Sequence, residues 1–140
     1  MSSERNSICG VRLRLAALVL VLLAFPLAAG AAPAFKVVFT ATKHTPKVNE
    51  RWNWSVKVTT TAGKPLAATI SAVVVDPIGG VHPVAYGCCA KKFVTKVKIK
   101  GTFRDFVQYP LAAKGYRVTF KVTVKTALGT KAVTYWVKTL

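Results

Sequence analysis

The most constraining feature of the chain is a two-residue alternation of apolar and polar side chains that begins near Phe35 and recurs to the C-terminus. It is clearest at residues 116–125, where aromatic and β-branched residues alternate with lysine, arginine and threonine. A period of two places every second side chain on the same face of an extended chain, as in a half-buried β-strand. No part of residues 35–140 keeps a helical period over three turns. The sequence therefore predicts an all-β domain.

Residues typical of turns divide this part of the chain at intervals close to ten residues. Seven strands are predicted between them, at residues 35–42, 51–60, 66–75, 92–100, 102–109, 116–125 and 132–138. A short additional strand near 84–90 stays open, because Gly87 and two cysteines interrupt its pattern. Alternation also fails at Phe106 and Val107, which favours a β-bulge there.

Seven short strands in one domain predict two packed sheets, because each sheet must bury its apolar face. The inward positions of two strands are the strongest candidates for the shared core. They are Trp52, Trp54, Val56, Phe120, Val122 and Val124. Trp136 is out of phase with its apolar neighbours, so it is expected either at the surface, where it could stack on a sugar or base, or under a loop.

Three local features resemble the secreted immunoglobulin-like and fibronectin-III-like domains of bacteria. Trp52 and Trp54 lie in the second predicted strand, where such domains often place a core tryptophan, and residues 61–66 resemble their G-[KQ]-P turn. The segment 109–116, which begins and ends with tyrosine, resembles their tyrosine corner. The resemblance implies a seven-stranded antiparallel immunoglobulin-like sandwich over residues 32–140, with a binding, spacing or adhesion role and no shared site.

The N-terminal segment has a different pattern. Three arginines precede an uncharged run over residues 15–35, whose first half is strongly apolar, and residues 29–31 (Ala-Gly-Ala) fit the small-residue rule for signal-peptidase cleavage. Residues 1–31 are therefore predicted to be a signal peptide, which makes the protein secreted or exposed on the cell envelope. The alternative is an uncleaved membrane anchor, since the uncharged run is long enough to span a bilayer. Both alternatives place residues 32–140 outside the cytoplasm.

The chain is strongly basic, with 21 Lys+Arg against 4 Asp+Glu and a formal net charge of +17. Residues 1–31 contain three arginines and one glutamate, so the predicted domain keeps 18 basic and 3 acidic residues and a charge of +15. Such a field attracts polyanions and anionic membranes. The predicted partner is an anionic polymer, an anionic surface or a protein outside the cytoplasm, with no specific nucleic acid and no small-molecule substrate expected.

Two predicted strands each place three basic side chains in phase, on one face of the strand. These residues are Lys96, Lys98 and Lys100 on one strand and Arg117, Lys121 and Lys125 on the other. If both strands belong to one sheet, the six residues form a cationic plate, which is the candidate polyanion-binding site. The alternative is plain solvation, because lysines also keep exposed sheets soluble and unpaired. The scarcity of acidic residues favours binding, since mixed signs would serve solubility equally well.

Catalytic side chains are scarce in the predicted domain. Its three acidic residues, Glu50, Asp76 and Asp105, are isolated in sequence, so a carboxylate pair for acid–base catalysis is not expected. Asp76 precedes a proline and is more simply a turn residue. No catalytic residue is assigned, and the protein is predicted to be no enzyme and to need no cofactor.

Cys88 and Cys89 are the only cysteines beyond the predicted signal peptide. Because they are neighbours, they cannot form the inter-sheet disulfide of antibody-type domains. Their spacing from His82 matches no standard zinc or copper cluster, so no metal site is predicted. In an oxidising compartment they could close a strained ring, pair with another chain or stay buried as thiols. A metal-handling or redox role using Cys88, Cys89 and His82 is an alternative.

The leading hypothesis is a noncatalytic exported binding or accessory domain, whose basic face holds an anionic envelope polymer, surface or partner protein. The alternative is a structural spacer or assembly module of the cell envelope, in which the charge serves solubility. A salt titration of binding to anionic polymers separates the two, because charge-driven binding weakens with salt.

Overall fold

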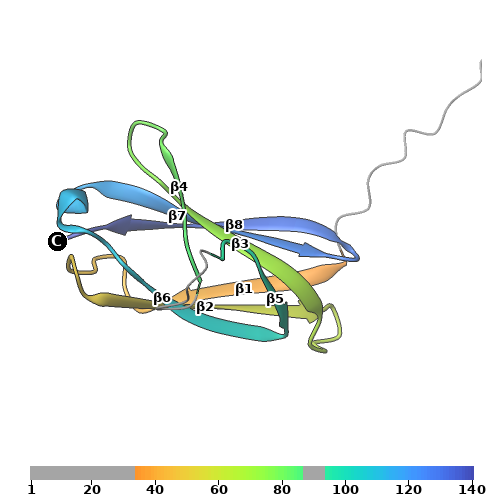
Figure 1. The fold of residues 1–140 in the computed structure, drawn as a ribbon. Coiled ribbons are helices and arrows are strands. Elements are labelled where there is room, and N and C mark those ends of the chain that lie inside the picture. Colours follow the sequence, from red (N-terminus) through yellow and green to blue (C-terminus); the bar gives the residue numbers. More distant parts are fainter. Residues whose placement is uncertain (1–33, 87–93) are drawn as a thin grey trace, which may run out of the picture.

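A computed structural model describes residues 34–86 and 94–140, which form eight β-strands and one short 3-10 helix (Figure 1). The predicted signal peptide and the adjacent cysteines Cys88 and Cys89 lie outside the described residues. The elements are β1 (Phe35–Ala41), β2 (Arg51–Thr60), β3 (Ala67–Val75), β4 (Val81–Pro83), β5 (Val97–Lys100), β6 (Thr102–Gln108), η1 (Leu111–Ala113), β7 (Arg117–Thr126) and β8 (Gly129–Lys138). The all-β prediction is confirmed.

The strands form two antiparallel sheets that lie in two layers (Figure 1). The first sheet has the order β1-β2-β6. The second has the order β4-β3-β7-β8, and β5 also pairs with β3. Because β3 pairs with β5 through its first half and with β4 through its second half, the two short strands share one edge of the sheet.

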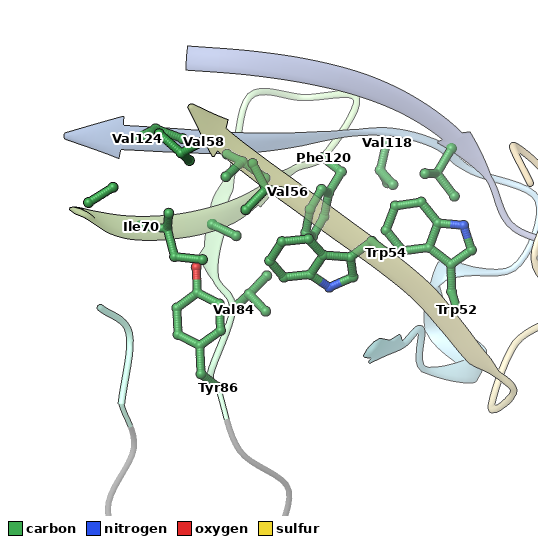
Figure 2. Close-up of a cluster of buried hydrophobic side chains, with 14 of the residues drawn as sticks. Trp52, Trp54, Val56, Val58, Ile70, Val84, Tyr86, Val118, Phe120 and Val124 are labelled. Atoms are coloured by element: carbon green, nitrogen blue, oxygen red, sulfur yellow. The ribbon is translucent and has the colours of Figure 1, made fainter. Parts of the chain in front are cut away.

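Buried apolar side chains from both sheets meet in one core (Figure 2). The residues predicted to form it are all at most 2% exposed: Trp52, Trp54, Val56, Phe120, Val122 and Val124. The rings of Trp52 and Trp54 in β2 have their centroids 5.1 and 5.2 Å from that of Phe120 in β7. The core prediction is confirmed, and these aromatic contacts join the first sheet to the second.

β4 is the strand that the sequence did not place correctly. All three residues of Val81–Pro83 are exposed, so the strand leaves no alternation to detect. The open prediction of a strand near 84–90 is wrong for its described part, where Tyr86 makes only an isolated bridge to Val94. Residues 87–90 lie outside the described residues. The described residues thus hold eight strands, and seven of them are at the predicted places: β2 has the predicted ends, and the other six differ at one or both ends.

The expected bulge in β6 is wrong, because the strand pairs one to one with β2 from Thr102 to Gln108. This register sets Asp105 opposite the buried Trp54 and turns Phe106 to the outer face. There the guanidinium carbon of Arg51 lies 4.5 Å from the centroid of the Phe106 ring. Alternation fails in the sequence because an acidic residue takes an inward position and an aromatic one takes an outward position.

Gly101 is the single residue between β5 and β6, which belong to different sheets. Its φ of 81° is a left-handed conformation that glycine adopts without strain. Its N–H donates to the Leu66 carbonyl at 3.1 Å, and its carbonyl accepts from the Val58 N–H at 2.9 Å. A Cβ added here would lie 3.0 Å from the Cβ of Pro65. Gly101 therefore defines where the chain crosses between the sheets.

Replacing Gly101 with alanine is expected to lower the free energy of unfolding by about 2–3 kcal/mol, because the left-handed backbone and the contact with Pro65 both oppose a Cβ. Gly63→Ala is the matched control. Gly63 has a φ of 82° with nothing within 4 Å of an added Cβ, so its loss should be only about 1 kcal/mol. Urea unfolding of both variants measures the difference, and equal losses would contradict crowding at Pro65.

The connection between β6 and β7 differs from the expected tyrosine corner. The Tyr109 carbonyl accepts from the Asn49 N–H at 2.8 Å, and the Gly115 N–H donates to the Thr139 carbonyl at 2.9 Å. Tyr109 is buried, but its hydroxyl has no hydrogen-bond partner among the described residues. Tyr116 is largely exposed. A tyrosine corner needs a hydroxyl bonded to the backbone, so Tyr109 does not form one.

Candidate functional site

The six predicted basic residues come together on the outer face of the second sheet. β5 and β7 lie on opposite sides of β3, and Thr69 of β3 pairs with both Lys98 and Lys125. Paired residues share a face, so these three side chains form a row across the sheet. With strands about 4.8 Å apart, the backbones of the two lysines are about 10 Å apart. The condition stated for a cationic plate, one sheet and one face, is met.

The other members follow from the same registers. Lys100 pairs with Ala67 and Lys121 with Val73 on β3, and the inward residues between the basic positions of β7 are buried. β5 was predicted from residue 92 but begins at Val97, so Lys96 lies just before it and keeps the phase of Lys98. All six side chains are exposed. We refer to Lys96, Lys98, Lys100, Arg117, Lys121 and Lys125 as the basic face.

Lys138 extends the basic face and was missed by the sequence prediction. It is exposed and pairs with Arg117 in the register of β7 and β8. The sequence does contain a pattern that predicts the position of Lys138. Residues 132–138 alternate as residues 116–125 do, and a tight turn joins the two strands. Carrying the hairpin register from that turn would have placed Lys138 beside Arg117.

The charges of the basic face have no acidic partner within the described part of the chain. Its two ion pairs are Lys47 with Glu50 at 3.9 Å and His82 with Asp76 at 3.0 Å, and neither involves the six residues. Lys98 and Lys125 are exposed and about one Debye length apart, so their fields overlap at physiological salt. The face is therefore a surface of positive potential open to solvent.

Four side chains form a stack at the β8 edge of the basic face. The His44 ring lies 4.0 Å from the Tyr135 ring and 4.0 Å from the Trp136 ring, at interplanar angles of 2° and 14°. The guanidinium carbon of Arg117 lies 4.9 Å from the Trp136 ring centroid. A 2.8 Å hydrogen bond between His44 Nδ1 and the Trp136 carbonyl, and one from the Lys138 N–H to the His44 carbonyl at 2.8 Å, fix the histidine against β8.

Trp136 is 42% exposed, which agrees with the surface position, one of the two alternatives considered for it from the sequence. Its ring already has two stacking partners within the protein, His44 and Arg117. Stacking and cation–π contacts of this kind order an edge strand and hold an arginine in place. The stack therefore positions Arg117 within the basic face.

Asp76 and His82 form a local pair beside the turn after β3. One Asp76 oxygen accepts from the N–H groups of Ile78 and Gly80, at 3.0 and 2.7 Å, and the other lies 3.0 Å from His82 Nε2. The hydrogen bond from His82, together with those backbone donors, lowers the pKa of Asp76. These bonds confirm Asp76 as a turn residue.

The described residues form no site for a metal ion or for the alternative redox role. Within residues 34–86 and 94–140, no three His, Cys, Asp or Glu side chains cluster in a way that could hold a metal ion. His82 is engaged by Asp76, and Cys88 and Cys89 lie outside the described ranges. In the same ranges, no helix has the length and apolarity needed to cross a membrane.

No family model and no curated protein matches the sequence. Solved structures give weak matches. A conjugative transposon lipoprotein of Bacteroides eggerthii has 8% identity over 76% of this chain and 98% of its own, with a TM-score of 0.46. A β-glucuronidase of Bacteroides uniformis has 10% identity over 71% of this chain and 12% of its own, with a TM-score of 0.44. The sporulation control protein Spo0M of Bacillus subtilis has 15% identity over 76% of this chain and 49% of its own, with a TM-score of 0.42.

The chain thus spans only 12% and 49% of the β-glucuronidase and Spo0M chains. At such identities and with every one of these TM-scores below 0.5, the matches assign neither a family nor an activity to this chain. The immunoglobulin-like family suggested by the sequence is not identified by them.

Proposed function

We propose that this protein is an exported, noncatalytic binding or accessory domain that holds anionic polymers or anionic surfaces of the cell envelope through its basic face. The observation that carries the proposal is the register of the second sheet, which sets the basic side chains of β5 and β7 on one exposed face. Binding through such a face is electrostatic and without sequence or linkage specificity.

Two further parts of the proposal rest on separate support. Export to the cell exterior is supported by the arginines, apolar run and small residues of positions 5–31. An immunoglobulin-like topology is supported by the strand order, because β1, β2 and β6 correspond to strands A, B and E, and β3, β4, β7 and β8 to C, C′, F and G. β5 is an addition to that order.

A structural spacer or assembly module is the second candidate, and one observation favours it. The outer face of the first sheet is also basic, with exposed Lys36, Lys57 and Arg104 on its three strands. Positive charge on both faces is what a general solubility role would produce. The two candidates therefore differ in whether one face binds more strongly than the other.

Replacing Lys96, Lys98 and Lys100 together with glutamine is expected to weaken polyanion binding and to reduce its salt dependence. Each lysine that contacts a single-stranded nucleic acid, used as a test polyanion, contributes about 0.7 to the slope of log affinity against log salt. The slope should therefore become shallower by about 2. Fluorescence anisotropy at several salt concentrations measures it, and the fold should persist because these side chains are exposed.

The matched control removes the same charge from the opposite face, as Lys36→Gln, Lys57→Gln and Arg104→Gln in one protein. Its salt slope should stay near that of the unchanged protein if the basic face is the binding surface. Equal effects of the two triple variants would assign binding to net charge alone and favour the structural module.

A further inference from the structure

A cavity of about 840 Å³ is lined by residues of β4, at an edge of the second sheet, and of β6, at an edge of the first. These two strands lie in different layers of the sandwich (Figure 1). Its lining includes Val74 and Val118 from the second sheet and Val107 from β6, together with Val84. Sites for small organic molecules are mostly apolar hollows of about 300–1,000 Å³. This cavity has the size and the lining of such a site.

The charge of the cavity is opposite to that of the protein. None of the described residues that line it is lysine or arginine, although the predicted domain has 18 of these and only 3 acidic residues. Two of those three, Asp76 and Asp105, line it. The oxygens of Asp76 are already bonded, one to two N–H groups of its turn and the other to His82 of β4. Asp105 is therefore the acidic group with capacity for a ligand.

Asp105 faces the interior with one oxygen lacking a partner. Its Oδ1 accepts from the Phe106 N–H at 2.8 Å, whereas its Oδ2 is buried and has no hydrogen bond within the described residues. Buried carboxylate oxygens are normally paired, because removing them from water without a donor is costly. A ligand that brings a cationic donor would supply the missing bond.

Two tyrosines also line the cavity, and one of them has a buried hydroxyl without a partner among the described residues. Tyr109 and Tyr116 contribute aromatic ring faces, which attract cations. Tyr109 is 3% exposed and its hydroxyl is likewise without a partner in residues 34–86 and 94–140. Burial raises the pKa of Tyr109, so its hydroxyl is neutral at physiological pH and can donate or accept.

We propose that this cavity binds a small amphipathic organic cation, with an ammonium group paired to Asp105 and an apolar body against Val74, Val84, Val107 and Val118. The site is distinct from the basic face and has the opposite charge preference, so it does not depend on the proposed polyanion binding. No sequence pattern predicts this site, because its lining comes from strands of both sheets and from three connecting segments.

A structural role for Asp105 is the competing explanation. β6 is the edge strand of the first sheet, and inward-pointing charges on edge strands prevent them from pairing with other chains. That role accounts for the charge of Asp105. It does not require a largely apolar cavity whose described lining contains no lysine or arginine, in a domain that is otherwise rich in both.

Three eight-carbon probes that differ only in the head group test the proposal: octylammonium, octanol and octanoate. Calorimetry with the full chain at physiological salt should show the highest affinity for octylammonium, a lower affinity for octanol and the lowest for octanoate. The affinities for octylammonium and octanol should differ about tenfold. Nuclear magnetic resonance should show shifts at Val74 and Val118. The net charge of +17 would by itself favour octanoate, so the order separates a local site from the overall field.

Asp105→Asn should lower the affinity for octylammonium about tenfold and leave octanol within about twofold. Glu50→Gln is the matched control, because it removes the same charge from an exposed residue that does not line the cavity. Ala112→Trp, at an exposed lining position, should weaken both octylammonium and octanol by filling the cavity. Ala112→Trp tests the location of the binding site even if Asp105→Asn fails to fold.

Octanoate binding as tightly as octylammonium would overturn the proposal, as would an ammonium preference that survives Asp105→Asn. Absence of binding by all three probes at millimolar concentration would also overturn it and leave Asp105 as an edge-protecting charge.

Discussion

Truncating either core tryptophan to alanine is expected to lower the free energy of unfolding by about 3–5 kcal/mol. Trp52 and Trp54 are 1% and 2% exposed and each packs on Phe120 across the two sheets. Removal of an indole leaves a cavity that neighbouring strands cannot fill without losing their own pairing. Since the free energy of unfolding of native proteins is only about 5–15 kcal/mol, each variant should lose a large part of its stability. Denaturant unfolding of the two variants measures it.

Phenylalanine at the same positions gives a sharper, matched comparison. Trp52 Nε1 donates to the Lys43 carbonyl at 2.7 Å, whereas the buried Trp54 Nε1 has no partner among the described residues. Trp52→Phe should therefore cost about 1 kcal/mol more than Trp54→Phe, because only the first loses a hydrogen bond. The reverse order would show that Trp54 Nε1 is bonded in solution and that the two indole environments are misassigned.

The affinity of the protein for a single-stranded polyanion is expected to fall roughly 300-fold between 50 and 200 mM salt if all six residues of the basic face make contacts. With about 0.7 per contact, the slope of log affinity against log salt is about −4. The cause is the release of condensed counterions from the polymer, which more salt in solution opposes. Titrations at four or five salt concentrations give the slope directly.

The slope also measures how many residues of the basic face contact the polymer. A slope near −2 would mean that only one of the two basic strands, β5 or β7, meets the polymer. Affinity that does not change with salt would exclude an electrostatic face altogether. The structural module would then be the better assignment, with the lysines acting against edge pairing and aggregation.

The period of two was sufficient to predict the strands that bury one face. In β2 and β7 each buried side chain is followed by a polar one, so Trp52, Val56 and Phe120 could be assigned to the core from their phase. The same phase identified the outward lysines and arginines of β5 and β7 before their sheet was known. Local patterns predict these features because solvent acts on each side chain according to its own polarity.

Where a polar residue points inward, the same pattern misleads. Asp105 interrupts the alternation of β6, and in the sequence alone this interruption indicates a bulge that the register does not contain. β4 left no pattern at all, because an edge strand with three exposed residues has no buried face. The tyrosine pair at 109 and 116 resembled a corner motif, yet the Tyr109 hydroxyl is unpaired among the described residues.

By itself the sequence determined the all-β class, the membership of the core and the in-phase basic side chains, because each depends on one strand and its contact with water or apolar neighbours. Only the tertiary structure decided that β5 and β7 flank β3, that Asp105 lies opposite Trp54, and that a cavity opens whose described lining is largely apolar and without lysine or arginine. These features depend on which strands pair and in which register. Pairing is a cooperative choice of the whole chain, so no local pattern contains it.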